Sequence, residues 1–503
     1  MSANAIAALA ALLVSALTLA VGAFGLRLAR TTSDFYVASR AVGPATNAAA
    51  ISGEYLSAAS FLGVAGLVMA RGVDMLWYPV GWTAGYLVLL LFVAAPLRRS
   101  RAYTLPDFAE FRLESQRART LASALGVLIA VLYLIPQFQG AGLTVHALTG
   151  APAWIGSTAV AVVVLASVVG GGMRSITLVQ AVQYWLKLAA LLVPLAFLLT
   201  TRHGGAPGAA ARLHSTDWLE PMRGPHSLYL TYSLIVATFL GTMGLPHVVV
   251  RFYTNRDGFA ARRTTVTVLG LLSVFYLLPP VYGVLGRHYL PSLSATDATD
   301  TAVLDLPGSV FGGTTADLLT AVLAAGAFAA FLSTSSGLVL SIAGVLGQDV
   351  LGHRFGGVAA FRIAATIGAL TTLALTLLSP GLAVAHAVEL AFAVAASTFA
   401  PMLLLGIWWP RLTAAGAISG MAVGGALSTA AVAIGLSGRS YGGLGGAILS
   451  QPALVTVPLA FATMVCVSLA TARPLHVART MVRLHTPEAV MVDRGGFRAR
   501  GAD

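Results

Sequence analysis

The sequence predicts an all-α integral membrane protein of about thirteen transmembrane helices, from its composition and from the length of its apolar stretches. Hydrophobic residues make up 57% of the 503 residues and charged residues only 10%, and the mean hydropathy is +0.84. These values lie outside the range of water-soluble domains. Apolar stretches of about 20 residues recur from end to end, and each is long enough to cross a hydrocarbon core of ~30 Å.

The expected helices follow one another with short connections. Their centres lie near residues 15, 57, 86, 130, 162, 188, 238, 273, 332, 368, 394, 424 and 460. The first stretch, Ile6 to Leu26, is interpreted as a retained helix, because its leader carries no positive charge and no clear cleavage site follows. Cys466 is the single cysteine, which excludes an intrachain disulfide and a cysteine metal cluster.

The basic residues indicate orientation. With an external N-terminus, about 23 arginines fall in inside loops or the tail and about 6 on the opposite side. The positive-inside rule therefore predicts a multi-pass plasma-membrane protein with the N-terminus outside and the C-terminus in the cytoplasm. The net charge of +12 is explained by topology, so the lipid bilayer and not nucleic acid is the expected partner.

No linker long enough to separate soluble domains is visible. We expect a single transmembrane domain over residues 1–475 and a short, Arg-rich cytoplasmic tail over residues 476–503.

Two apolar segments are interrupted near their middle. One is NAAAISGEYLSAASFLG, where Gly53 stands beside Glu54, and the other is FLGTMGLPHVVVRF, with Gly244 and Pro246. Such breaks are typical of transporter binding sites, because the carbonyls freed at mid-membrane need protein, water or an ion as partner. The alternative is that small residues merely let helices pack closely. The breaks lie five segments apart, and a repeat with an odd number of crossings must be inverted.

Seven pieces of the sequence stand in the order found in one transporter family. They are DFYVASR at Asp34, SAASFLGVAGLVMARG from Ser57, YTLPDFAEFR from Tyr103, GGMRSITLVQAVQ from Gly171, GLPHVVVRFYT from Gly244, AAFLSTSSGLVLSIAGVLGQD from Ala329, and the stretch from Ala395 through Pro401 to Trp409 and Arg411. The chain resembles the sodium/solute symporter family, and within it the cation/acetate (monocarboxylate) branch. The resemblance implies a LeuT-like core of 5+5 inverted repeats over about residues 42–410.

The resemblance also implies an ion site. It assigns a sodium ion to the carbonyls of Gly53, Leu56 and Ala330 and to the hydroxyls of Ser333 and Thr334. Uncharged oxygens of this kind suit a monovalent cation that must be released again. The alternative for the two hydroxyls is a hydrogen bond to their own helix, four residues earlier.

One position departs from the family pattern. Several sodium-coupled members carry an aspartate in a stretch that resembles WTDVIQ, whereas this chain has LVQAVQ with Gln180 in its place. The departure puts a second sodium site in doubt.

Further polar residues in apolar segments are candidates for substrate binding or coupling. Ionisable groups in a bilayer are costly, which singles out Glu54, Lys187 and Glu389, with a structural ion pair or a water-exposed position as the alternative. The amides of Gln137 and Gln139 and the hydroxyl of Tyr55 are candidate partners of a carboxylate, unless they serve only as polar contacts between helices.

These observations predict a symporter that couples the inward flow of a monovalent cation, sodium or a proton, to uptake of a small monocarboxylate such as acetate. The alternatives are symport of another small solute, namely proline or another amino acid, a sugar or urea, and a transporter-like membrane sensor. No nucleophile with a base and no paired carboxylates are visible in the sequence, so we do not expect an enzyme. We expect no cofactor besides the coupling ion, and a small organic anion as substrate.

Overall fold

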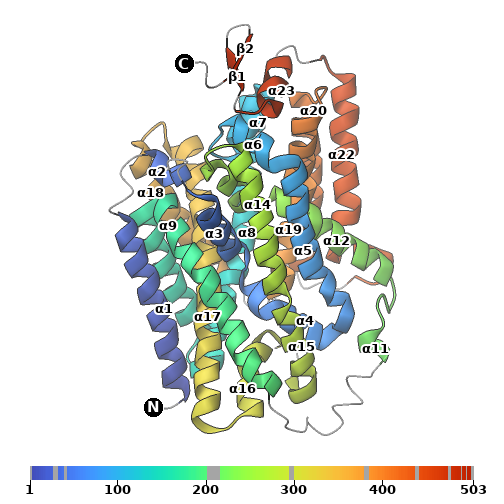
Figure 1. Ribbon diagram of the computed structural model, residues 1–503. Coiled ribbons are helices and arrows are strands. Elements are labelled where there is room, and N and C mark those ends of the chain that lie inside the picture. The colour runs from blue at the N-terminus through green and yellow to red at the C-terminus, as the bar shows by residue number, and fades with distance from the viewer. Residues whose placement is uncertain are drawn as a thin grey trace.

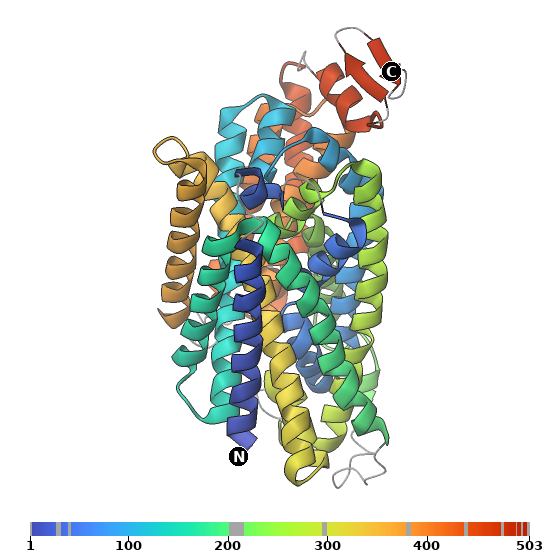
Figure 2. The same ribbon diagram turned by 60° about the vertical axis from the view of Figure 1, so that its left-hand side comes forward.

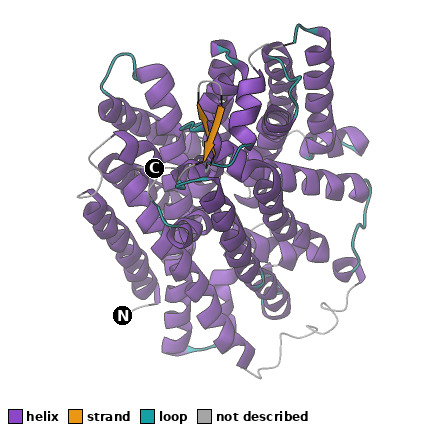
Figure 3. Ribbon diagram, turned by 45° about the horizontal axis from the view of Figure 1, so that its top comes forward, coloured by secondary structure: helices purple, strands orange, loops and turns teal. Residues whose placement is uncertain are grey.

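The structure is a computed structural model, and it describes residues 3–26, 32–38, 42–200, 216–293, 299–378, 384–436, 441–473, 477–488, 490–493 and 496–499. The described chain is a tall bundle of helices (Figure 1), and its two strands form one hairpin close to the C-terminus (Figure 3).

The helices of the first half are α1 (Ala3–Leu26), α2 (Thr32–Val37), α3 (Pro44–Tyr55), η2 (Ala59–Gly63), α4 (Val64–Arg71), η3 (Gly72–Leu76), α5 (Trp77–Val88), η4 (Leu89–Val93), α6 (Ala94–Ser100), α7 (Leu105–Leu113), α8 (Gln116–Thr149), α9 (Ala153–Thr200), α11 (Thr216–Leu219), α12 (Ser227–Gly244), α13 (Pro246–Val250) and η5 (Arg251–Thr254). The second half contains α14 (Gly258–Tyr276), α15 (Leu278–Tyr289), η7 (Thr299–Thr301), α16 (Ala302–Val310), α17 (Gly313–Leu346), η8 (Gly347–Leu351), α18 (Gly357–Leu378), α19 (Val384–Trp408), α20 (Ala414–Leu436), α21 (Gly443–Ser450), α22 (Ala453–Ala470), α23 (Val477–His485), β1 (Val490–Asp493) and β2 (Gly496–Ala499).

Eleven stretches within the described residues are long and apolar enough to cross a membrane. Two of them, Ala59–Ser100 and Ala153–Thr200, are 42 and 48 residues long, about twice what one crossing needs. The second bends at Gly172, whose φ of 56° and ψ of −158° are not helical. The predicted all-helical membrane class is confirmed, while the count of thirteen crossings stays a prediction.

The outer surface of the bundle is apolar, as lipid contact requires. Large hydrophobic side chains such as Leu13 (61% exposed), Leu199 (61%) and Leu378 (78%) point away from the protein. In water this exposure would be a liability, whereas in a bilayer it costs nothing.

Both predicted helix breaks are confirmed. α3 ends at Tyr55, and Leu56 leaves the helical region with φ −73° and ψ 84° before η2 begins at Ala59. α12 ends at Gly244, and Leu245 is extended with φ −73° and ψ 119°. α13 then starts at Pro246, where a missing N–H costs nothing in the first turn of a helix.

The broken helices lie in the interior of the bundle. α3 packs against α9 and α17, and α12 packs against α5 and α19. A close approach makes the first contact possible, since a Cβ on Gly53 would lie 2.1 Å from the carbonyl oxygen of Gln180 on α9. The break in α3 is therefore held directly against two long helices.

The C-terminal segment folds back onto the bundle. Arg99 on α6 donates to the carbonyl of Leu484 on α23 at 3.3 Å, and Arg483 donates to the carbonyl of Ser100 at 3.2 Å. The predicted domain limits and the cytoplasmic place of the tail stay predictions.

The two ends of the described chain lie at opposite ends of the bundle (Figures 1 and 2). We expect a reporter fused after Asp503 to read as cytoplasmic and a reporter fused before Met1 to read as external. A phosphatase and a fluorescent protein, each active on one side only, provide the measurement. Two reporters on the same side would contradict an odd number of crossings.

Candidate ion and substrate site

A buried lysine lies at the junction of the α3 break, α9 and α17. The Lys187 side chain is 0% exposed, and its Nζ donates to the carbonyl of Gly53 at 2.5 Å, the carbonyl of Leu56 at 2.6 Å and the Oγ of Ser333 at 2.6 Å. An ammonium has three N–H donors, and here all three have a partner. Three of the five residues in the predicted ion site thus surround one ammonium.

The other two residues of the predicted ion site lie next to this group. Thr334 donates to the carbonyl of Glu54 at 2.6 Å, and so closes α17 onto the last turn of α3. The carbonyl of Ala330 accepts a hydrogen bond from the hydroxyl of Ser333 at 3.1 Å. The structure therefore brings all five predicted residues to one place.

A second cationic side chain lies on the other side of Glu54. Arg251, at the start of η5, is 1% exposed, and its Nε lies 2.5 Å from Oε2 of Glu54. The same guanidinium donates to Oγ1 of Thr177 at 2.8 Å and to Oε1 of Gln180. Arg251 thus joins the helix that follows the second break to α3 and α9.

Gln180 occupies the position of the family's aspartate and uses both ends of its amide. Its carbonyl oxygen accepts from Arg251, and its Nε2 donates to the backbone carbonyl of Ser333 at 2.8 Å. A carboxylate has no donor for that carbonyl, whereas an amide satisfies both neighbours. The glutamine therefore fits a structure in which an arginine supplies the nearby positive charge.

Beside these charges lies a closed aromatic cluster, defined as Tyr55, Trp82, Tyr86, Tyr133, Tyr276 and Phe392. Their rings meet at centroid distances between 4.9 Å, for Tyr55 and Tyr86, and 6.4 Å, for Tyr55 and Phe392. Within the described part of the chain, Nε1 of Trp82 and the hydroxyl of Tyr86 are buried and have no hydrogen-bond partner. Buried donors of this kind are costly unless a ligand or water satisfies them.

The predicted substrate residues occupy different parts of this region. The hydroxyl of Tyr55 is shared with Oγ1 of Thr242 at 2.8 Å, so it joins the two broken helices. Gln137 accepts from the backbone N–H of Ala58 at 3.2 Å, which satisfies a donor released by the first break. Gln139 is half-buried and does not belong to the aromatic cluster.

Glu389 lies apart from the ion site. It accepts hydrogen bonds from the hydroxyl of Tyr78 at 2.5 Å and from the amide of Gln451. The ring of Tyr78 meets that of Trp82 at 5.4 Å. Glu389 therefore lies at the edge of the aromatic cluster and makes structural contacts there.

Two small clefts lie in the described part of the bundle, one on the side of the C-terminus and one on the side of the N-terminus. The C-side cleft holds about 330 Å³ of empty space, and its lining includes Thr104, Pro246, Ser341 and Gly344. The N-side cleft holds about 270 Å³ and is lined by Ala58, Leu62, Gly140, Leu143, Thr144, Asp300 and Thr301. Residues next to each helix break thus line a separate cleft.

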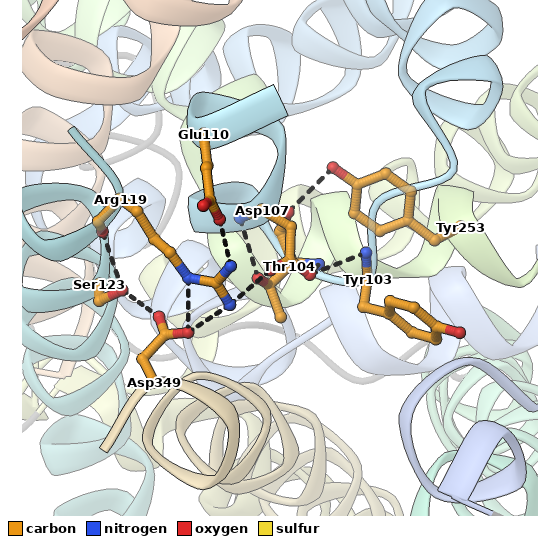
Figure 4. A network of polar contacts seen from close by, with 8 residues as sticks. All are labelled: Tyr103, Thr104, Asp107, Glu110, Arg119, Ser123, Tyr253 and Asp349. Carbon is orange, nitrogen blue, oxygen red and sulfur yellow. Dashed lines mark hydrogen bonds and ion pairs between the residues drawn. The ribbon is translucent and has the colours of Figure 1, made fainter. Parts of the chain in front are cut away.

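A polar network lies beside the C-side cleft and shares Tyr103 and Thr104 with its lining (Figure 4). Arg119 of α8 binds Asp107 at 2.8 Å and Asp349 of η8 at 2.6 Å, and it also pairs with Glu110. Burial raises the pKa of the Asp107 carboxyl, while the positive charge of Arg119 acts in the opposite direction. Tyr253, two residues after Arg251, donates to the carbonyl of Thr104 at 3.3 Å. The network ties α7, α8, η5 and η8 together at this end of the bundle.

The positive-inside rule places Arg251 among the about 23 arginines of the inside loops, so its place in the buried centre is not predicted from the sequence. The signal was its place in FLGTMGLPHVVVRF, only five residues after Pro246 and inside an apolar stretch. The sequence identifies Lys187 as an intramembrane charge, but nothing in it connects this residue with the oxygens of Gly53 and Ser333.

Residues 35–424 match the model of the sodium:solute symporter family. The chain belongs to this family. It is 33% identical over 482 residues to the uncharacterized symporter YwcA of Bacillus subtilis (strain 168), with 91% of this chain and 93% of the relative covered. It is 32% identical over 486 residues to a monocarboxylic acid transporter of Corynebacterium glutamicum, with 87% and 86% covered. The family and these relatives are transporters, not enzymes.

Two solved structures share the fold. A Na+-coupled sialic acid symporter in a substrate-bound outward-open state has a TM-score of 0.74 at 14% identity, with 93% of this chain and 98% of that chain covered. The nucleobase-cation-symport-1 family transporter Mhp1, in a closed conformation with bromovinylhydantoin bound, has a TM-score of 0.58 at 14% identity, with 89% and 98% covered. Likeness at this level of identity concerns the fold alone.

Proposed function

We propose that the protein is a secondary active symporter of the plasma membrane that couples the inward flow of a monovalent cation to the uptake of a small monocarboxylate such as acetate. The observation that carries the proposal is the meeting of both helix breaks with α9 and α17 in one buried, charged centre. The relation to a monocarboxylic acid transporter over 87% of the chain supports the substrate class.

A LeuT-like core of 5+5 inverted repeats over about residues 42–410 belongs to this proposal. Its support is the spacing of the two breaks, in α3 and between α12 and α13, and the family membership. In such a core the substrate and the ion reach a midplane site alternately from the two sides.

The aromatic cluster is the proposed substrate site. A carboxylate only accepts hydrogen bonds, so it needs donors, and Nε1 of Trp82 and the hydroxyl of Tyr86 are buried donors without a partner in the described chain. The surrounding rings are apolar, as contact with a short carbon chain requires. A small monocarboxylate suits both features, because its carboxylate can accept from the two donors and its carbon chain can contact the rings.

Uptake into proteoliposomes tests the proposal. Labelled acetate, propionate and pyruvate are compared with proline, glucose and urea, while sodium and proton gradients are imposed separately. We expect concentrative uptake of the monocarboxylates only. If proline, glucose or urea is taken up and none of the carboxylates is, the protein is a symporter for that other solute. If no solute is taken up, the result favours a membrane sensor.

Trp82→Phe and Tyr86→Phe are expected to raise the KM for the monocarboxylate by about tenfold or more, because a hydrogen bond to a charged group contributes about 1.5–3 kcal/mol. Tyr282→Phe is the matched control, because its hydroxyl donates to the carbonyl of Leu191, outside the aromatic cluster. Initial uptake rates at equal protein content give the KM. An unchanged KM in both variants would place the substrate elsewhere.

A further inference from the structure

Residues 477–488, called the C-terminal strap below, lie at one end of the bundle next to α6 and α7 (Figure 1). The helical part of the strap is α23, in which Val477, Thr480 and Leu484 are buried and Arg479 is exposed. The three buried residues recur at helical spacing and therefore share one face of the helix. The C-terminal strap is thus packed against the bundle along one side of its helix.

Two pairs of elements meet under the strap, and each pair is held together by a buried arginine. Arg98 of α6 donates to the carbonyl of Asn255 at 2.5 Å, which fixes α6 to the turn before α14. Arg112 of α7 donates to the carbonyl of Gly406 at 2.6 Å, which fixes α7 to the end of α19. We therefore treat α6 with α14 as one pair and α7 with α19 as the other.

The strap binds the α6–α14 pair through a carboxylate and a guanidinium. The N–H of Gly258, the first residue of α14, donates to Oε1 of Glu488 at 2.7 Å. A negative charge is stabilised at the N-terminus of a helix by the free N–H groups there. Oε2 of Glu488 pairs with Arg99 of α6 at 3.4 Å, and Arg99 also donates to the carbonyl of Leu484 at 3.3 Å.

The strap also binds the α7–α19 pair, through two ring contacts. The guanidinium of Arg483 lies 4.9 Å from the ring centre of Phe111 on α7, where a cation is attracted by the aromatic face. The ring of His485 meets that of Trp408, the last residue of α19, at 4.8 Å. Arg483 donates in addition to the carbonyl of Ser100, the last residue of α6, at 3.2 Å. A single side chain therefore contacts both pairs.

The C-side cleft has one wall that leads to α14 and another that begins α7. Pro246 and Val250 belong to α13, which η5 connects to α14, while Thr104 and Leu105 stand at the start of α7. Tyr253 of η5 donates to the carbonyl of Thr104 at 3.3 Å, so these two walls are in contact. For the cleft to widen, α13 and α7 must move apart.

We propose that the C-terminal strap is an autoinhibitory contact, which holds the α6–α14 pair against the α7–α19 pair, keeps the C-side cleft narrow and so limits the rate of the transport cycle. This inference rests on the proposed symport function, in which the site opens to each side in turn. The strap must release one of the pairs each time the cleft widens. Its contacts therefore favour the narrow state, because only interactions that differ between two states shift their equilibrium.

A cysteine in the cleft reports release of the strap. Ser341→Cys lies in the lining of the C-side cleft, and Cys466→Ser removes the exposed natural cysteine. In this background, Arg483→Met and Glu488→Ala together remove contacts of the strap to both pairs. We expect a maleimide to label the purified combined variant about fivefold faster, since hydrogen bonds to charged groups are lost only in the narrow state. Arg479→Met, at an exposed position one turn before Arg483, is the matched control and should leave the labelling rate unchanged.

A second cysteine separates release of the strap from a general loosening of the protein. Thr144→Cys, again with Cys466→Ser, lies in the lining of the N-side cleft. Alternating access couples the two sides, so a wider C-side cleft requires a narrower N-side cleft. We expect the combined strap variant to slow labelling at this position. If labelling is unchanged at both positions, or becomes faster at both, the strap only packs against the bundle and the inference is wrong.

A milder variant keeps the test valid if the combined variant does not stay monodisperse. Glu488→Gln preserves the shape of the side chain and an acceptor for Gly258, but it loses the ion pair with Arg99. We expect the same two changes in labelling rate, each smaller than in the combined variant. Unchanged labelling in a folded Glu488→Gln protein would contradict the role given to the ion pair.

Uptake into proteoliposomes gives the functional measurement. At a saturating concentration of labelled monocarboxylate, we expect a higher initial rate for the variant with Arg483→Met and Glu488→Ala than for wild type and Arg479→Met. A rate equal to or below that of wild type in the folded combined variant would show that the strap does not limit the cycle, and would overturn the inference while the symporter stands. If the wild type transports no monocarboxylate, the proposed function fails, whereas cysteine labelling needs no substrate and still decides on the strap.

Discussion

Arg251→Met is expected to abolish uptake and to lower the Tm of the protein markedly. The guanidinium of Arg251 is buried and holds Glu54, Thr177 and Gln180 at once. Its removal leaves the carboxylate of Glu54 without its hydrogen-bonded partner, and breaking a buried ion pair in this way costs about 3–5 kcal/mol. It also disconnects the helix that follows the second break from α3 and α9, which the proposed alternating access requires to be connected.

A double-mutant cycle measures the contribution of the pair. Glu54→Gln and Arg251→Met are each compared with the combined variant by Tm and by the yield of monodisperse protein. We expect the combined variant to be more stable than Arg251→Met, because the lone carboxylate is gone, and to remain inactive. Arg117→Met, at an exposed position of α8, is the control and should behave as wild type. Wild-type uptake by Arg251→Met would show that the ion pair has no part in transport.

The membrane fold and both helix breaks could be predicted from the sequence, because they depend on local patterns. A stretch of about 20 apolar residues has one stable solution in a bilayer. Pro246 cannot continue the preceding helix, and Gly53 weakens the helix in which it stands. The structure places the breaks at Leu56 and Leu245, inside the two segments named.

The contacts of the long charged side chains could not be predicted, because they depend on packing between distant segments. Lys187 and Gly53 are 134 positions apart, and Arg251 and Glu54 are 197 positions apart. The positive-inside rule also treats every arginine near the end of a segment as a loop residue. It gives no sign that Arg251 turns inward after the short helix α13.

The partners of the Gln180 amide likewise could not be predicted from the sequence. The sequence shows that a carboxylate is missing, which argues against a second cation. The structure shows an arginine bound to the amide instead. Arg251 thus places a positive charge beside the position where several family members carry a carboxylate.

Gly53→Ala is expected to abolish uptake, although it adds a single methyl group. The new Cβ would lie 2.1 Å from the carbonyl oxygen of Gln180 and 3.3 Å from the backbone nitrogen of Tyr184. Both atoms belong to the backbone of α9, so no side chain can turn away to make room. α3 must therefore move off α9, and the 2.5 Å contact between Nζ of Lys187 and the carbonyl of Gly53 is lost.

Two further glycines provide matched comparisons for this variant. Gly270→Ala on α14 meets no atom within 4 Å, and because alanine favours helix over glycine by about 1 kcal/mol, its uptake and Tm should equal or exceed those of wild type. The Cβ of Gly337→Ala would lie 1.9 Å from Oε1 and 2.7 Å from Cγ of Glu54, which is a side chain and not backbone, so we expect an intermediate loss of uptake. Initial uptake rates normalised to folded protein rank the three variants. If Gly53→Ala transports as well as Gly270→Ala, transport does not require the close contact of α3 with α9. It then does not require the hydrogen bond from Lys187 to the carbonyl of Gly53 either.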